Sequence, residues 1–138
     1  MRIVLDTNVL IAGLLSAHGA PAQLLDLALA AEDVVVLLDD RIMAEYVEVA
    51  RRPKFGLSAV DVARVLDALA TVGEHIVARP LSVTLPDRDD LPFLEIAAAG
   101  DADALVTGNG RHFTPKRGRH AVRVCTPREL LDALRERR

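Results

Sequence analysis

The sequence has few aromatic residues, one cysteine and no tryptophan. Aromatic residues make up only 3%, which disfavours a nucleic-acid surface that stacks bases on rings. Cys125 has no partner for an internal disulfide, which fits a reducing cytosol. The apolar runs are too short for a membrane span, and the chain opens on a strand-like segment, so we expect no signal peptide. A net charge of −3 disfavours a generic polyanion binder, although local basic patches can flank an acidic site.

Several common site motifs are also missing. The sequence has no Walker loop, no GxGxxG, no nucleophile elbow and no zinc-ligand spacing. What it does have is an apolar fraction of 51% over 138 residues, which argues against disorder. A chain of this length can bury roughly two-thirds of the surface that its unfolded form exposes, so it needs no disulfides or structural metals to fold. We therefore expect a single domain over residues 1–138.

Short apolar runs alternate with helical patterns along the whole chain. This order predicts an α/β protein whose mostly parallel sheet is covered on both faces. The predicted strands are 2–6, 34–38, 75–78, 104–107 and 121–125. The predicted helices are 9–15, 21–31, 40–52, 58–73, 93–99 and one that begins at Thr126. Right-handed crossovers would bring the carboxyl ends of the strands to one edge of the sheet.

Asp6 is the first candidate site residue. It ends the first predicted strand, and open α/β sheets bind ligands at the carboxyl ends of their strands. The following Thr7 and Asn8 could orient a metal-bound carboxylate through hydroxyl and amide groups. The alternative is an aspartate that only caps the next helix.

Two further acids lie at comparable positions. Glu45 borders the apolar stripe of its predicted helix, where a carboxylate is costly unless it is paired or bound to a metal. It could instead be a surface glutamate, or pair with Arg41 or Arg52. Asp90 closes the acidic loop 86–90 just before a helix, where an aspartate can also serve as a cap. Together with Asp6, these acids could form a site for a hard divalent cation.

The fourth predicted strand adds polar groups at both of its ends. Asp103 precedes it, Thr107 ends it, and Asn109 follows on the same edge as Asp6. Asn109 could supply a neutral oxygen ligand, or be an ordinary turn residue beside two glycines. Basic residues after Asn109 could hold a phosphodiester backbone, unless they are simply solvated: Arg111, His112 and Lys116. A second basic cluster closes the Glu45 helix: Arg51, Arg52 and Lys54.

Five stretches resemble the PIN-domain nucleases, and together they cover nearly the whole chain. They are IVLDTNVLIAGLL at 3–15, MAEYVEV at 43–49 with RPKF at 52–55, DDLPFLEIA at 89–97, ADALVTGN at 102–109, and TPRELL at 126–131. The resemblance implies a three-layer α/β/α sandwich with a sheet of about five strands. It also implies metal ligation by Asp6, Glu45 and Asp90.

The same resemblance implies a function. Such proteins are similar to VapC-like toxins of type II toxin–antitoxin systems, which are cytoplasmic, Mg²⁺- or Mn²⁺-dependent endoribonucleases. It further implies an RNA substrate, homodimerisation and a small cognate antitoxin. The sequence departs from the family at Asn109, where many relatives have an aspartate, and Asp103 is a candidate to compensate as a metal ligand.

Other functions remain open. The Asn109 departure is compatible with a non-catalytic or weakly active binding domain on the same scaffold, and a housekeeping RNA or DNA nuclease is a further alternative. A DNA 5′ nuclease is disfavoured because 138 residues leave no room for its arching insertion. A phosphoacceptor receiver domain is disfavoured because Leu5, and not a second acid, precedes Asp6.

Overall fold

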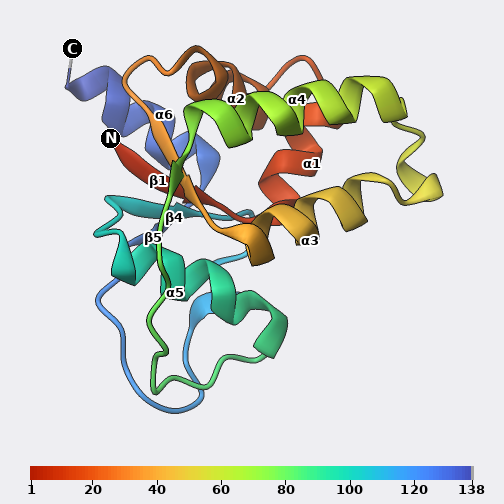
Figure 1. Cartoon of the computed structure of the whole chain (residues 1–138). Coiled ribbons are helices and arrows are strands. Elements are labelled where there is room, and N and C mark those ends of the chain that lie inside the picture. The colour runs from red at the N-terminus through yellow and green to blue at the C-terminus, as the bar shows by residue number, and fades with distance from the viewer. Residues whose placement is uncertain (138) are drawn as a thin grey trace.

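The computed structural model describes residues 1–137, and its centre is a parallel sheet (Figure 1). The sheet has five strands in the order β3-β2-β1-β4-β5. Their bounds are Arg2–Leu5 for β1, Val35–Leu38 for β2, Glu74–His75 for β3, Ala104–Val106 for β4 and Val124–Cys125 for β5. The central strand β1 pairs with β2 on one side and with β4 on the other. The predicted α/β class and the parallel sheet are both confirmed.

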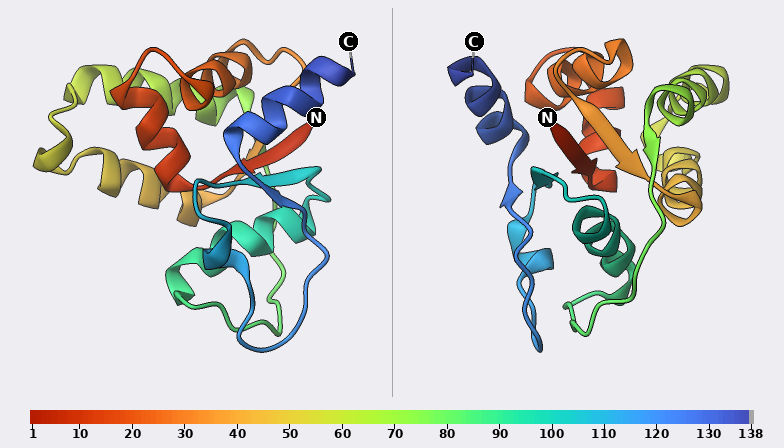
Figure 2. Two further views of the ribbon diagram at one scale, coloured as in Figure 1. Left: turned by 180° about the vertical axis from the view of Figure 1, so that it is seen from behind. Right: turned by 60° about the vertical axis from the view of Figure 1, so that its left-hand side comes forward.

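Helices cover both faces of the sheet and complete an α/β/α sandwich (Figure 2). Their bounds are Thr7–Leu15 for α1, Ala20–Ala30 for α2, Asp40–Ala50 for α3, Ala59–Val72 for α4, Leu91–Ala99 for α5 and Pro127–Glu136 for α6. Helix α5 packs against β1, β2 and β4 from one side. On the other side α4 contacts β2, α6 contacts β4, and α2 lies against both of these helices. Among residues 1–137, no helix is long and apolar enough to cross a bilayer.

Local sequence explains where the helices next to the sheet begin. Ile3, Val4 and Leu5 are almost fully buried, so β1 is a central strand that must end where polar residues begin. Asp6 and Asp39 then cap α1 and α3 by accepting backbone N–H groups. Thr126 and Glu129 form the capping box that the sequence predicts for α6. Strand ends and helix starts therefore coincide at the carboxyl edge of the sheet.

The third strand differs from its prediction. It covers Glu74–His75 instead of residues 75–78, because only these positions pair with β2 at the edge of the sheet. The chain then leaves the sheet in a long connection that meets a later loop through an antiparallel bridge between Thr84 and Arg117. Gly118 makes this meeting possible, since its φ is +78° and an added Cβ would lie 2.2 Å from the Ser82 carbonyl oxygen.

Candidate active site

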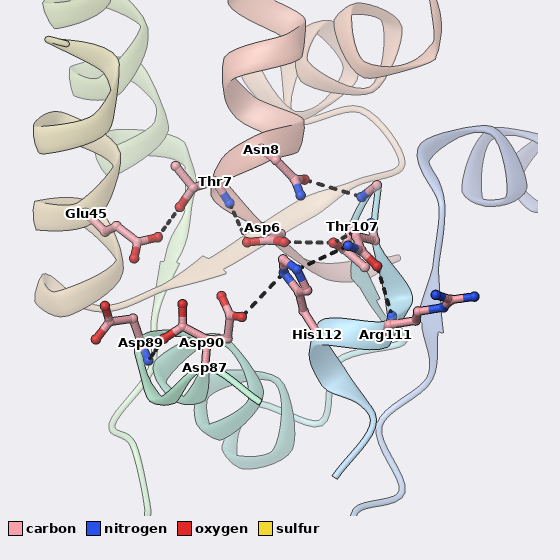
Figure 3. A network of polar contacts seen from close by, with 12 residues as sticks. Asp6, Thr7, Asn8, Glu45, Asp87, Asp89, Asp90, Thr107, Arg111 and His112 are labelled. Carbon is pink, nitrogen blue, oxygen red and sulfur yellow. Dashed lines mark hydrogen bonds and ion pairs between the residues drawn. The ribbon is translucent and has the colours of Figure 1, made fainter. Parts of the chain in front are cut away.

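Asp6 lies at the carboxyl end of β1, where the sequence places it, and its side chain also caps α1. Its side chain is only 4% exposed. One carboxylate oxygen accepts the Thr7 N–H at 2.8 Å, and the other accepts the Thr107 hydroxyl at 2.7 Å (Figure 3). Burial raises the pKa of Asp6, and these two hydrogen bonds oppose that rise. The carboxylate is therefore held in a fixed orientation.

Glu45 reaches the same place from α3. Its carboxylate accepts the hydroxyl of Thr7 (Figure 3). The next residue, Tyr46, is fully buried and donates its hydroxyl to the Leu5 carbonyl, which ties α3 to the end of β1. Burial raises the pKa of Glu45, the Thr7 hydrogen bond opposes this, and the charge of Asp6 adds to the rise.

Asp90 completes the group from the start of α5. Its Oδ2 atom is buried and accepts no hydrogen bond from residues 1–137, and the ring nitrogen Nδ1 of His112 lies 3.5 Å away. Burial, reinforced by the charge of Asp6, raises the pKa of Asp90 to about 6. A buried carboxylate oxygen without a donor is rare in native structures and calls for an explanation.

These three acids line one cleft of about 510 Å³. Asp87 and Asp89 line it too, and Asp87 also accepts the Asp89 N–H. Within residues 1–137 no three acidic, histidine or cysteine side chains already stand in the arrangement of a formed metal site. One oxygen of Glu45 accepts the Thr7 hydroxyl, and the ring of His112 lies beside Asp90 without donating a hydrogen bond to it. The three predicted acids thus line the same cleft, but their oxygens are not close enough together to form a metal site as they stand.

The loop after β4 forms the other wall of the cleft. The Asn109 N–H donates to the Thr107 hydroxyl, and the Asn109 side-chain amide lies 3.1 Å from Nε2 of His112. Asn109 does not line the cleft itself, so it contacts the acids only through these two neighbours. Asn8 accepts the Gly108 N–H and holds the loop against α1 (Figure 3).

Two predicted site residues lie elsewhere. Asp103 is at the amino end of β4, opposite the cleft, where it accepts the Arg2 N–H at 2.7 Å. The expectation that it compensates as a metal ligand is therefore wrong. Lys116 lies in the loop that pairs with Thr84 and is not part of the cleft.

The basic residues of the cleft agree only in part with those that the sequence favoured. Arg111 is exposed, and in Figure 3 its side chain points away from the acids. His112 lines the cleft, as do Arg52 and Phe55 from the segment after α3. The basic cluster that closes the Glu45 helix therefore contributes one guanidinium, that of Arg52, to the lining of the cleft.

Sequence reasoning missed Glu95, a carboxylate only 7% exposed on α5. It accepts Arg41 Nη1 of α3 at 2.8 Å and the Leu81 N–H at 3.3 Å. Glu45 lies on α3 and Asp90 directly precedes α5, so this ion pair holds together two of the segments that supply acids to the cleft. Its sequence context, LPFLEIAAA, offered the signal, because the neighbours of Glu95 are apolar on every side.

Removing this carboxylate should destabilise the protein. Glu95→Ala is expected to lower the free energy of unfolding by about 2 kcal/mol, because it leaves the Leu81 N–H without its acceptor and the Arg41 guanidinium without its buried partner. Urea denaturation measures the change. The matched control is Glu48→Ala on α3, whose exposed pair with Arg52 should be worth less than about 0.5 kcal/mol. Equal losses in both variants would contradict the role of Glu95.

Comparisons with known proteins agree with this architecture. The chain is similar to a chain in the crystal structure of VapBC2 from Rickettsia felis bound to a DNA fragment from their promoter, with a TM-score of 0.55. The identity is 16%, and the match covers 91% of this chain and 98% of that chain, so the likeness shows the fold alone. No curated protein sequence matches this chain significantly. The family model of the PIN domain matches residues 2–111, and the chain therefore belongs to the PIN domain family.

Proposed function

We propose that this protein is a metal-dependent endoribonuclease, and that it is the toxin of a toxin–antitoxin pair. One observation carries the proposal: Asp6, Glu45 and Asp90 come from three different elements and line the same cleft at the carboxyl edge of the sheet. Their convergence is costly, since each acid has a raised pKa and the charge of Asp6 contributes to the rise in the other two. Such an arrangement fits a site that binds a cation.

The donor set of the cleft fits a hard divalent cation. Carboxylate oxygens are the ligands that Mg²⁺ and Mn²⁺ take, and within the described part of the chain nothing donates a hydrogen bond to the buried Asp90 Oδ2. Asp6, Glu45 and Asp90 would hold the ion. When bound, such an ion lowers the pKa of water and stabilises negative charge on a phosphate.

The other residues act on these ligands. Thr107 and the Thr7 N–H fix the two oxygens of Asp6, and the Thr7 hydroxyl holds Glu45. Asn109 orients the ring of His112, which faces Asp90. His112 and Arg52 are the basic groups of the cleft that can meet an RNA phosphate, although Arg52 also pairs with Glu48. Arg111 and Lys116 lie outside the cleft and would contact more distant phosphates of the RNA.

The toxin assignment rests on resemblance. The similar chain comes from a structure named for VapBC2, and the sequence stretches around the three acids resemble VapC-like toxins. By this likeness the protein acts in the cytoplasm, forms a homodimer and is inhibited by a small cognate antitoxin. Expression in a bacterial host should arrest growth, and co-expression of the antitoxin encoded beside it should restore growth. Unimpaired growth at a verified level of folded protein would contradict the toxin role.

The nuclease activity is tested with purified protein and labelled RNA and DNA of the same sequence. We expect cleavage of RNA in Mg²⁺ or Mn²⁺, no cleavage in EDTA, and little cleavage of DNA. Cutting in EDTA would contradict the metal dependence. Preferential cutting of DNA would favour a DNA nuclease.

One observation favours a second function, a non-catalytic binding domain. One oxygen of Glu45 is engaged by the Thr7 hydroxyl, His112 lies 3.5 Å from one oxygen of Asp90, and residues 1–137 contain no formed three-acid metal site. Isothermal titration separates the two functions. Binding of Mn²⁺ that Mg²⁺ competes away supports the nuclease, whereas no heat with either ion supports the binding domain.

A further inference from the structure

A second hollow adjoins the acidic cleft on the far side of α1. Its volume is about 420 Å³, within the range of about 300–1,000 Å³ that is usual for small-ligand sites. Asn8 and Ala12, on the first turns of α1, line both the cleft and this hollow. An RNA strand bound across the acids can therefore pass directly from the cleft into the hollow.

The walls of the hollow are mostly aliphatic. They are formed by Val9, Ala12, Ala20, Pro21 and Pro127. Pro21 and Pro127 belong to the first turns of α2 and α6, where proline is favoured, so two rigid rings meet the same hollow. A flat apolar group can be covered here even though the chain has few aromatic rings.

Polar groups also line the hollow and could fix the orientation of a ligand. Asn8 uses its side-chain oxygen to accept the Gly108 N–H, which leaves its NH₂ group as a donor. Arg128 is exposed and pairs with no acid among residues 1–137. The hollow thus combines an apolar body, the side-chain amides of Asn8 and Asn109, and a cation. These features complement the face of a nucleobase, one of its carbonyl oxygens and a neighbouring phosphate.

We propose that this hollow binds the base of a nucleotide next to the cleaved phosphate, and that Arg128 holds a phosphate of the same RNA strand. The inference rests on the proposed ribonuclease function and adds a base-binding subsite to it. Contacts with a base would make cleavage depend on which nucleotide occupies the hollow.

Abasic RNA tests this subsite. A set of single-stranded RNAs, each lacking one base, is measured for binding in EDTA by fluorescence anisotropy and for cleavage in Mn²⁺. For the wild-type protein we expect one position, adjacent to the cut, where loss of the base weakens binding by about 10-fold. If wild-type protein cuts RNA but binds every abasic RNA like the intact one, the subsite is disproved while the ribonuclease function stands. If it neither binds nor cuts RNA, both proposals fail.

Two variants locate the effect. Ala20→Met fills the hollow, so it should weaken binding of intact RNA to the level of the abasic RNA and abolish the difference between them. The control is Ala30→Met, the same change at an exposed position at the other end of α2, which should keep the difference. Retention of the difference by a folded Ala20→Met would overturn the proposal.

Arg128→Gln provides a second test that does not depend on filling the hollow. It should reduce the slope of log K against log salt by about 0.7, because one phosphate contact is lost from a single strand. Arg137→Gln, further along the same carboxyl-terminal segment, should leave the slope unchanged. Equal slopes for Arg128→Gln and wild type would contradict the phosphate contact.

Discussion

Replacing Asp6 with asparagine is expected to reduce RNA cleavage by at least about 100-fold, because the proposed ion contributes several kcal/mol to the stabilisation of the transition state. The amide in Asp6→Asn has the same shape as the carboxylate, and it can still accept the Thr7 N–H and donate to the Thr107 oxygen. The fold should therefore survive while a charged ligand is lost. Single-turnover cleavage in saturating Mn²⁺ gives the rate, and thermal unfolding reports on the fold.

The matched control is Asp26→Asn, the same change on the exposed face of α2. It should cleave RNA at the wild-type rate. An Asp6→Asn protein that also cleaves at that rate would remove Asp6 from the mechanism. An Asp6→Asn protein that melts well below wild type would instead indicate that the carboxylate is needed mainly as the cap of α1.

Asp6 and Asp90 could be located from the sequence because strand ends and helix starts are local features, whereas Glu45 lies within α3 and was indicated by its place beside the apolar stripe of the helix. Asp6 directly follows a buried strand, and parallel strands end at a common edge. The prediction that Asp103 is a metal ligand was wrong because this residue precedes its strand. The length of β4 therefore separates it from the edge where Asp6 lies. A residue that precedes a parallel strand lies at the opposite edge of the sheet from one that follows it.

The remaining misplacements come from contacts between distant segments. Lys116 follows His112 closely in sequence, but the loop that carries it is drawn away by its pairing with Thr84. Glu95 was missed because its partners, Arg41 and Leu81, lie on other elements. No local pattern specifies such pairings, and only the burial implied by an apolar neighbourhood hints at them.

Neutralising Asp90 is expected to stabilise the protein at neutral pH. The pKa of Asp90 is about 6 in the folded state against an ordinary value of 3.8, so the native state binds this proton more tightly than the unfolded state. Stability must then fall as the pH rises through the window between these two values, and the full cost is present at pH 7. Asp90→Asn removes that cost, and we expect a gain of about 1–2 kcal/mol at pH 7 that disappears near pH 4.

Urea denaturation at pH 4 and pH 7 measures this gain, with Asp67→Asn on the exposed face of α4 as the control that should change stability by less than about 0.5 kcal/mol at either pH. Mn²⁺ at pH 7 should raise the melting temperature of the wild type more than that of Asp90→Asn, since the variant has lost a charged ligand. A stability gain together with a weaker response to Mn²⁺ would mean that the Asp90 carboxylate lowers the stability of the fold and serves to bind an ion. If Asp90→Asn is instead less stable than wild type at pH 7, the pairing of Asp90 with His112 outweighs the cost of burial, and Asp90 is a structural residue.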